Sequence, residues 1–111
     1  MEITTKQLKR VDVVTVSGRI DSSTAPELDK VLTSIVDADR YCICMDLKGL
    51  EYLSSAGIKV LISTLKTCKR WNRGGLRLAN MPPYIAEVFD LAGLVPLFNI
   101  YPNLVDAVGS F

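Results

Sequence analysis

The sequence predicts an α/β fold in which helices cover a mixed, mostly parallel sheet. Two stretches of alternating apolar residues come first, and segments with helical spacing then alternate with short apolar runs. This alternation is typical of parallel strands joined by helices, and the two consecutive opening strands make the sheet mixed. The 111 residues allow one core but not two, so we expect a single domain over 1–111 with about five strands and about four helices.

The first part of the chain indicates two strands followed by a helix. Glu2 to Lys9 alternates weakly, as an edge strand does, and Val11 to Ile20 alternates more strongly. The turn at 21–24, with Pro26 in the first helical turn, has the composition of a helix start. The apolar residues that follow recur at helical spacing: Leu28, Val31, Leu32 and Ile35.

The middle of the chain indicates a central strand. Tyr41 to Leu47 is apolar on both faces, as expected where a sheet is covered by other elements. We expect this strand to stop at Lys48 and Gly49, before a short apolar passage that ends at Leu53.

A second helix is predicted from Ser55 to about Arg70. Ser54 and Ser55 stand where N-cap residues stand, and the apolar residues behind them form one helical stripe. The stripe consists of Ile58, Leu61, Ile62 and Leu65.

The last third of the chain contains shorter elements. A turn is expected at three residues, Asn72, Gly74 and Gly75. A strand over 76–80 precedes a helix that opens at 82–83 and stops at Gly93. A final strand over 97–101 and a short helix over 103–108 complete the prediction.

Composition excludes several functions. The formal net charge is +1, and no basic stripe with interleaved aromatic residues indicates a nucleic-acid partner. The longest apolar runs are too short for a membrane span, and residues 1–10 lack the apolar centre of a signal peptide. We therefore expect a cytoplasmic protein.

The sequence also argues against catalysis and against a metal or cofactor. It has no histidine, no glycine-rich phosphate loop and no Gly-x-Ser-x-Gly motif, so no activated nucleophile is identifiable. The three cysteines fit a reducing compartment, and Cys42 and Cys44 share one face of a strand. We interpret the cysteines as small apolar residues, and we expect a binding protein that is not an enzyme.

Two helix starts are the candidate functional site. Right-handed crossovers bring the starts of helices near the carboxyl ends of parallel strands, so the turns at 21–24 and 54–57 should share one rim. A helix N-terminus has unpaired N–H groups and a partial positive charge, which favour an anion. A serine at this point either caps the helix or carries a phosphate.

The stretch from Asp46 to Leu61 resembles the central signature of STAS domains, the anti-sigma factor antagonist family. Other parts of the chain are similar to further landmarks of the family: Gly18-Arg19-Ile20-Asp21, Gly74 to Leu78, Val88 to Leu94, and Phe98 with Ile100 and Tyr101. The resemblance implies that Ser55 is the phosphorylated serine. The aspartate that normally precedes this serine is replaced by Ser54, which is therefore an alternative acceptor.

The resemblance also implies a partner. This is a serine-kinase anti-sigma factor of the ATPase type, whose capture releases a sigma factor, with a serine phosphatase to reset the switch. The kinase would supply ATP and magnesium, so no cofactor is expected in this chain. The residues expected to bind the partner are Asp21, Ser22, Ser23, Ser54, Ser55, Ala56, Gly57 and Lys59.

Three alternatives remain open from the sequence. Both serine hydroxyls could merely cap the helix, so that the domain acts only by docking. The chain could be a scaffold or accessory STAS protein in a stress-signalling or transport complex. It could also be a small-molecule or nucleotide-binding domain.

Overall fold

The computed structural model describes residues 1–71 and 74–111. Within these residues, five strands form one sheet: β1 (Glu2–Gln7), β2 (Asp12–Ile20), β3 (Cys42–Leu53), β4 (Gly75–Ala79) and β5 (Asn99–Tyr101). Their spatial order is β1-β2-β3-β4-β5. β1 is antiparallel to β2 and the remaining neighbours are parallel, which confirms the mixed, mostly parallel sheet predicted from the sequence.

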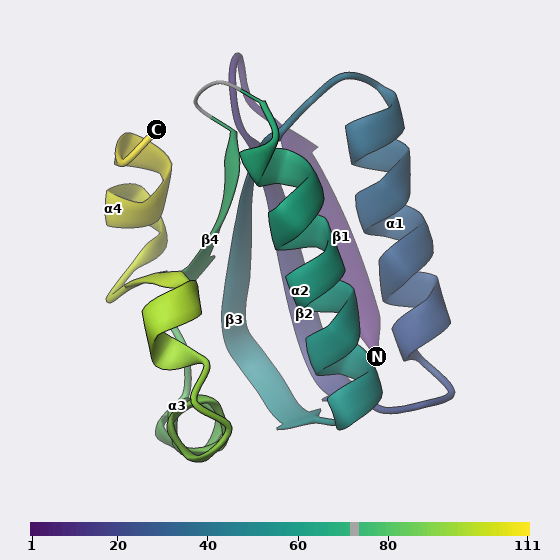
Figure 1. The fold of residues 1–111 in the computed structure, drawn as a ribbon, viewed down its shortest axis with the longest axis vertical. Coiled ribbons are helices and arrows are strands. Elements are labelled where there is room, and N and C mark those ends of the chain that lie inside the picture. The colour runs from purple at the N-terminus through teal and green to yellow at the C-terminus, as the bar shows by residue number, and fades with distance from the viewer. Residues whose placement is uncertain (72–73) are drawn as a thin grey trace.

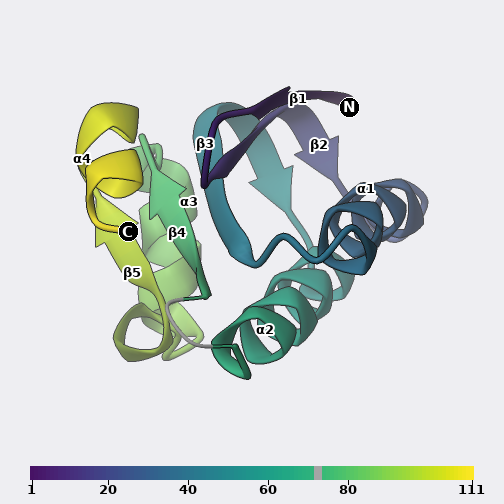
Figure 2. The same ribbon diagram turned by 90° about the horizontal axis from the view of Figure 1, so that it is seen from above.

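Four α-helices occur in the described part of the chain: α1 (Ala25–Asp37), α2 (Ser55–Lys69), α3 (Pro83–Leu91) and α4 (Leu104–Gly109). A short 3₁₀ helix, η1 (Val95–Leu97), lies between α3 and β5. Figures 1 and 2 show α1 and α2 side by side against the sheet. None of the helices in these residues is long and apolar enough to cross a membrane.

The main core lies between the sheet and helices α1, α2 and α3. Val14 and Val16 alternate along β2, Met45 and Leu47 alternate along β3, and all four are fully buried. Buried side chains from the three helices meet them: Leu28, Leu32, Leu61, Ile85 and Phe89. Burial of these apolar side chains is the main force that holds the helices on the sheet.

A smaller core contains Cys44 of β3, Ala79 of β4 and Ala107 of α4. Because these residues alternate with those of the main core, the central strands are apolar on both faces. Burial raises the pKa of the Cys44 thiol and of the Cys68 thiol to about 11, so both remain protonated at neutral pH. The two thiols therefore pack as small apolar groups, whereas Cys42 is partly exposed.

The central strand is longer than predicted. The prediction that it stops at Lys48 and Gly49 was wrong, because β3 continues to Leu53. The long neighbouring strand β2 supplies partners for this extension: Ser17 pairs with Gly49, and Ile20 pairs with Leu53. Two register shifts along this ladder accommodate the irregular stretch. Local composition favoured a turn, whereas backbone pairing across the sheet favours a strand.

The buried face of α2 is rotated relative to the predicted stripe. Leu61 and Leu65 are buried as predicted, but Ile58 and Ile62 are only partly buried at the side of the core. The other buried positions of the helix are Gly57, Thr64 and Cys68. The threonine tolerates burial because its hydroxyl donates a hydrogen bond to the carbonyl of Val60 at 2.9 Å.

Further boundaries differ from the prediction, among them the end of the first strand, which stops at Gln7 and not at Lys9. Gly75 begins β4 and is not part of the preceding turn, since its amide donates to the Tyr41 carbonyl beside the start of β3 at 2.8 Å. The strand predicted over 97–101 is shorter, because the proline-containing η1 ends at Leu97 and β5 begins at Asn99. The turn residue Asn72 lies outside the described residues.

The position of Leu61 in the core provides a test of the fold. Its side chain is 1% exposed, so Leu61→Ala should lower the free energy of unfolding by about 2–5 kcal/mol. Ser63→Ala, at an exposed position of the same helix, should change it by less than about 0.5 kcal/mol. Urea denaturation measures both values. Similar losses for the two variants would contradict the observed orientation of α2.

Candidate functional site

The predicted rim exists at the carboxyl ends of β2 and β3 (Figure 1). Ile20 and Leu53 are paired at the ends of the two parallel strands, and the Ser54 amide donates to the Ile20 carbonyl at 2.8 Å. The turn at 21–24 therefore begins beside the turn at 54–57. The structure brings the two helix starts together as the sequence predicted.

Asp21 organises the first of these turns. Its Oδ1 accepts hydrogen bonds from the amides of Ser23 (3.0 Å) and Thr24 (3.1 Å), and from the Ser23 hydroxyl (2.7 Å). The N-cap of α1 is Thr24, whose side chain makes no capping hydrogen bond among the described residues. Asp21 instead closes the turn that precedes the helix, as Asx turns do.

These hydrogen bonds have an electrostatic consequence. The bond from the Ser23 hydroxyl, followed by that from the Thr24 amide, holds the pKa of the Asp21 carboxyl below its ordinary value of 3.8. Since the lowered pKa belongs to the folded state, the contribution of the carboxylate to stability is present above the ordinary pKa. It is lost as the pH falls through the lowered value. Asp21 is therefore a carboxylate at neutral pH.

The two serines at the start of α2 have different environments. Ser54 is the N-cap, with an extended backbone, and its Oγ accepts a hydrogen bond from the Gly57 amide at 3.2 Å. Ser55 is the first residue of the helix and is exposed, and its side chain makes no hydrogen bond with any described residue. The capping function is thus fulfilled by Ser54, and the hydroxyl of Ser55 is left for solvent or a partner.

Gly57 sets the distance between α2 and the strands. A Cβ atom at this position would lie 2.6 Å from Cγ2 of Ile20 and 2.7 Å from Cδ1 of Leu53. Only glycine fits this approach without moving either side chain. Gly57 is buried and Ala56 is partly buried. These two residues therefore hold the rim in place and offer little surface to a partner.

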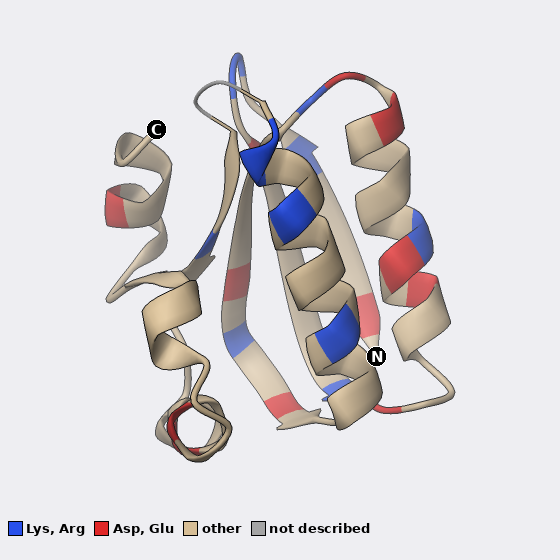
Figure 3. Ribbon diagram, in the orientation of Figure 1, with Lys and Arg blue, Asp and Glu red and all other residues tan. Residues whose placement is uncertain are grey.

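The exposed part of the rim carries hydroxyls and one cation. Ser22, Ser23 and Ser55 are exposed, and Lys59 is exposed four residues after Ser55. Residues four apart lie on the same side of a helix. Figure 3 shows basic (blue) segments along α2, whereas α1 beside it carries mainly acidic (red) segments. Ser55 therefore lies near the end of a basic helical surface.

Arg19 and Tyr52 are part of the same rim but were not predicted as site residues. The guanidinium of Arg19 lies 4.2 Å from the centre of the Tyr52 ring, a cation–π geometry. Arg19 precedes Asp21 by two residues, and Tyr52 precedes Ser54 by two residues. This shared spacing is the sequence feature that could have indicated that the two residues belong to the rim. Their contact depends on the register of β2 against β3. Bulges shift this register, so the sequence alone does not predict which residues are paired.

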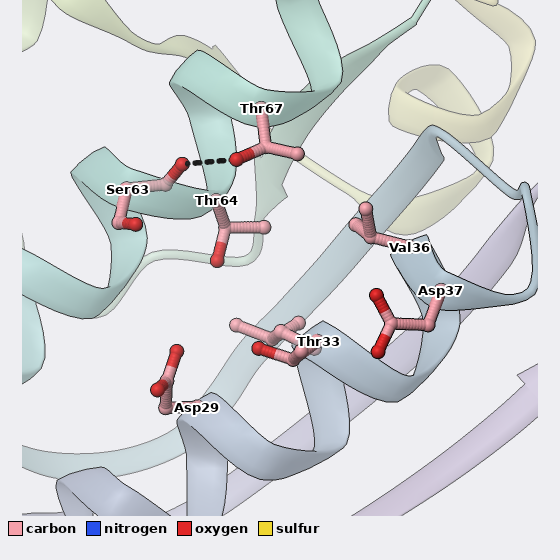
Figure 4. A pocket seen from close by; sticks show the side chains of 8 residues that line it. Asp29, Thr33, Val36, Asp37, Ser63, Thr64 and Thr67 are labelled. Atoms are coloured by element: carbon pink, nitrogen blue, oxygen red, sulfur yellow. Dashed lines mark hydrogen bonds between the residues drawn. The ribbon is translucent and has the colours of Figure 1, made fainter.

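A cavity between α1 and α2 is separate from this site. It has a volume of about 230 Å³ and contains the carboxylates of Asp29 and Asp37 (Figure 4). The Thr67 hydroxyl, which also lines it, donates to the carbonyl of Ser63 at 3.1 Å. The two carboxylates would repel an anion, so this cavity does not extend the phosphate-compatible rim.

Comparison with known families identifies the domain. A family profile for the STAS domain matches residues 2–107. The chain belongs to the STAS domain family. The turn before α1 and the serine-containing start of α2 therefore lie in a STAS domain, as the sequence resemblance indicated.

Relatives of this STAS domain include anti-sigma factor antagonists. The chain is 31% identical over 87 residues to the anti-sigma-B factor antagonist of Staphylococcus aureus. The aligned residues cover 78% of this chain and 80% of that protein. It is 27% identical over 111 residues to BtrV of Bordetella bronchiseptica, which is named provisionally as an anti-sigma factor antagonist. That match covers 100% of this chain and 95% of BtrV.

Solved structures share the fold. An anti-sigma factor antagonist from Mycobacterium paratuberculosis has a TM-score of 0.84 and 30% identity, with 98% of this chain and 92% of that chain covered. The antagonist SpoIIAA in its unphosphorylated form has a TM-score of 0.79 and 19% identity, with 99% and 98% covered. At that identity, the match to SpoIIAA supports the fold of this STAS domain alone.

The different environments of the two serines are testable. Ser54→Ala removes the cap of α2 and should lower the free energy of unfolding by about 1 kcal/mol, within a range of about 0.5–2. Ser54→Asp should retain most of that stability because aspartate also caps. Ser55→Ala should change stability by less than about 0.5 kcal/mol. Urea denaturation of the three variants checks the assignment, and equal losses for the two alanine variants would refute it.

Proposed function

We propose that this STAS domain is an anti-sigma factor antagonist whose partner binding is controlled by phosphorylation of Ser55. The observation that carries the proposal is the exposed Ser55 hydroxyl, which has no hydrogen bond with a described side chain or backbone group, at the N-terminus of a 15-residue helix. The names of the relatives from Staphylococcus aureus and Mycobacterium paratuberculosis support the antagonist role. The domain then acts by binding and not by catalysis.

Ser55 is favoured over Ser54 as the acceptor because of their hydrogen bonds. A kinase that modifies Ser54 would have to break the hydrogen bond between Ser54 Oγ and the Gly57 amide, and would thereby remove the N-cap of α2. Modification of Ser55 breaks no bond within the described chain. Ser54 remains the alternative acceptor, since it is adjacent and stands where the family carries an aspartate.

Phosphate on Ser55 should leave the domain folded. The group adds nearly two negative charges and three acceptor oxygens. At an exposed helix N-terminus, negative charge is stabilising by about 0.3–1 kcal/mol. Lys59 is exposed one turn further along α2 and adds a favourable charge. The relevant effect is therefore on the partner, which meets new charge and bulk where a small hydroxyl stood.

The partner that fits this switch is an anti-sigma factor that is also a serine kinase of the ATPase type. It binds the unmodified rim, releases its sigma factor and transfers a phosphoryl group from its own magnesium-bound ATP. A serine phosphatase restores the hydroxyl, and we place the cycle in the cytoplasm. SpoIIAA, which shares the fold with TM-scores of 0.75 and 0.79, has been solved in a phosphorylated and an unphosphorylated form, so this fold can accommodate a phosphate.

The contact surface for the partner is the rim. Its exposed members offer hydroxyls and charges, and its buried members hold the two turns in register. The proposed binding residues are Asp21, Ser22, Ser23, Ser54, Ser55, Ala56, Gly57 and Lys59.

Replacing Asp21 tests whether the first turn contributes to binding. Asp21→Ala removes the acceptor of the turn and should weaken partner binding about tenfold, or ~1.4 kcal/mol, without unfolding the domain. Asp37→Asn is the matched control, because this exposed carboxylate lies at the other end of α1. Isothermal titration with the anti-sigma factor captured from native lysate measures both. Binding unchanged by both Asp21→Ala and Ser22→Arg would place the interface elsewhere.

Replacing Ser55 tests the switch itself. Ser55→Ala should fold, bind the partner and incorporate no phosphate, whereas Ser55→Asp should fold and bind at least tenfold more weakly, a loss of ~1.4 kcal/mol or more. Mass spectrometry after incubation with the kinase and ATP locates the phosphate. Phosphate on Ser54 alone would move the switch by one residue, and phosphate on neither serine would leave only a docking module.

A further inference from the structure

Three neighbouring cavities lie around α4, away from the rim. The first lies between β1, β2 and the side of α4, with a volume of about 410 Å³. It shares Leu8 and Val108 with a second cavity of about 240 Å³. The second shares Arg10 and Phe111 with a third cavity of about 400 Å³. The shared residues make the three cavities neighbours along one surface, and we refer to them together as the α4 groove.

Most of the α4 groove is apolar. Its first part is formed by Leu8, Val13, Leu104, Val105 and Val108. Val105 is 81% exposed, although it stands among other apolar side chains. Covering a surface of this kind with a hydrocarbon group lowers the free energy of the system.

The other end of the α4 groove carries two arginines, Arg10 and Arg77. Nε of Arg77 donates to the Ser110 hydroxyl at 3.0 Å, and its guanidinium lies 4.2 Å from the centre of the Phe111 ring. Gly75 leaves room for this guanidinium, since a Cβ there would lie 2.3 Å from Nη1. Arg77 is therefore held in place, and its two terminal nitrogens make no hydrogen bond with a described residue.

Arg10 adds a second cation at the same end. It is exposed and forms no hydrogen bond or ion pair with any described residue. The remaining charged side chains along the α4 groove, Lys6 and Lys9, are also cations, and no acidic side chain of the described residues lines any of its three parts. Two guanidinium groups at one end of an apolar channel favour a carboxylate attached to a hydrocarbon chain.

We propose that the α4 groove binds a long-chain fatty acid, with the carboxylate between Arg10 and Arg77 and the alkyl chain along the apolar wall beside Val105. Charge complementarity selects the anionic head, and the apolar side chains of the neighbouring cavities select a hydrocarbon chain over a compact anion. The residues involved belong to β1, β2, β4, α4, the turn between β1 and β2, and the two residues after α4, and none of them is a rim residue. This site is consequently independent of phosphorylation at Ser55.

Titration of the full chain with dodecanoate, below its micelle concentration, tests the proposal. Calorimetry should give saturable binding to one site, with butanoate too weak to detect. Each added methylene between these lengths should improve the affinity by about twofold to fourfold, since the groove covers the chain incompletely. Dodecanol, which has the same chain without the charge, should bind at least about tenfold more weakly if a charge-assisted contact is made.

Four variants locate the binding site. Arg10→Gln and Arg77→Gln should each weaken dodecanoate binding about threefold to tenfold. Val105→Glu should abolish detectable binding, whereas Leu91→Glu, at a residue of α3 that is also 81% exposed, should leave it unchanged. Arg10 and Val105 are exposed, so their variants should keep the native circular dichroism spectrum. The location of the binding site can therefore be tested even if Arg77→Gln does not fold.

Several outcomes would overturn the proposal. These are absence of dodecanoate binding, equal binding of dodecanol, or equal losses for Val105→Glu and Leu91→Glu. Binding to phosphatidylglycerol vesicles without binding of monomeric dodecanoate would assign the surface to a membrane. None of these results depends on the kinase, so the proposal fails or stands separately from the switch at Ser55.

Discussion

The rim of this domain depends on the close approach of α2 to the ends of β2 and β3. The Ser54 amide donates to the Ile20 carbonyl at 2.8 Å, which attaches the start of the helix to the neighbouring strand. One turn later, Gly57 leaves no space for a Cβ atom against Ile20 and Leu53. The two contacts fix the helix start beside the Asp21 turn. A protein partner that docked on the proposed interface would therefore meet both turns as one preformed surface, with little ordering required on binding.

That constraint explains why two adjacent serines have different environments. Because the helix begins directly at the strand end, its first N–H groups need an acceptor, and the Ser54 hydroxyl provides it. Ser55, one residue further, has helical backbone geometry and an exposed side chain. A helix start that is already capped can accept a phosphate without losing its cap. The replacement of the family aspartate by Ser54 thus removes a charge beside Ser55 but retains the capping function.

The rim and the α4 groove present different chemistry. At the rim, serine hydroxyls and an ionised Asp21 surround a helix N-terminus, and the proposed signal is a covalent change of charge. In the α4 groove, valine and leucine side chains lead to two arginines, and the proposed ligand is an anionic amphiphile. Both surfaces are supported by the sheet. The rim lies at the ends of β2 and β3. Arg77 of β4 contacts Ser110 and Phe111, and the absence of a side chain at Gly75 leaves room for its guanidinium. One small domain can therefore carry two binding surfaces without either needing the other to change shape.

The sequence alone determined the α/β class, the mixed sheet, the two helix starts on one rim and the STAS resemblance, because these follow from local periodicity, capping residues and chain connectivity. Tertiary structure decided what depends on distant partners. Pairing with β2 extended the central strand past Gly49, and packing against the sheet turned α2 so that Ile58 and Ile62 lie at the edge of the core. The Arg19–Tyr52 contact and the α4 groove likewise join residues far apart in the chain. Periodicity specifies that an apolar face exists, but only the packed neighbours determine its rotation and which side chains remain free.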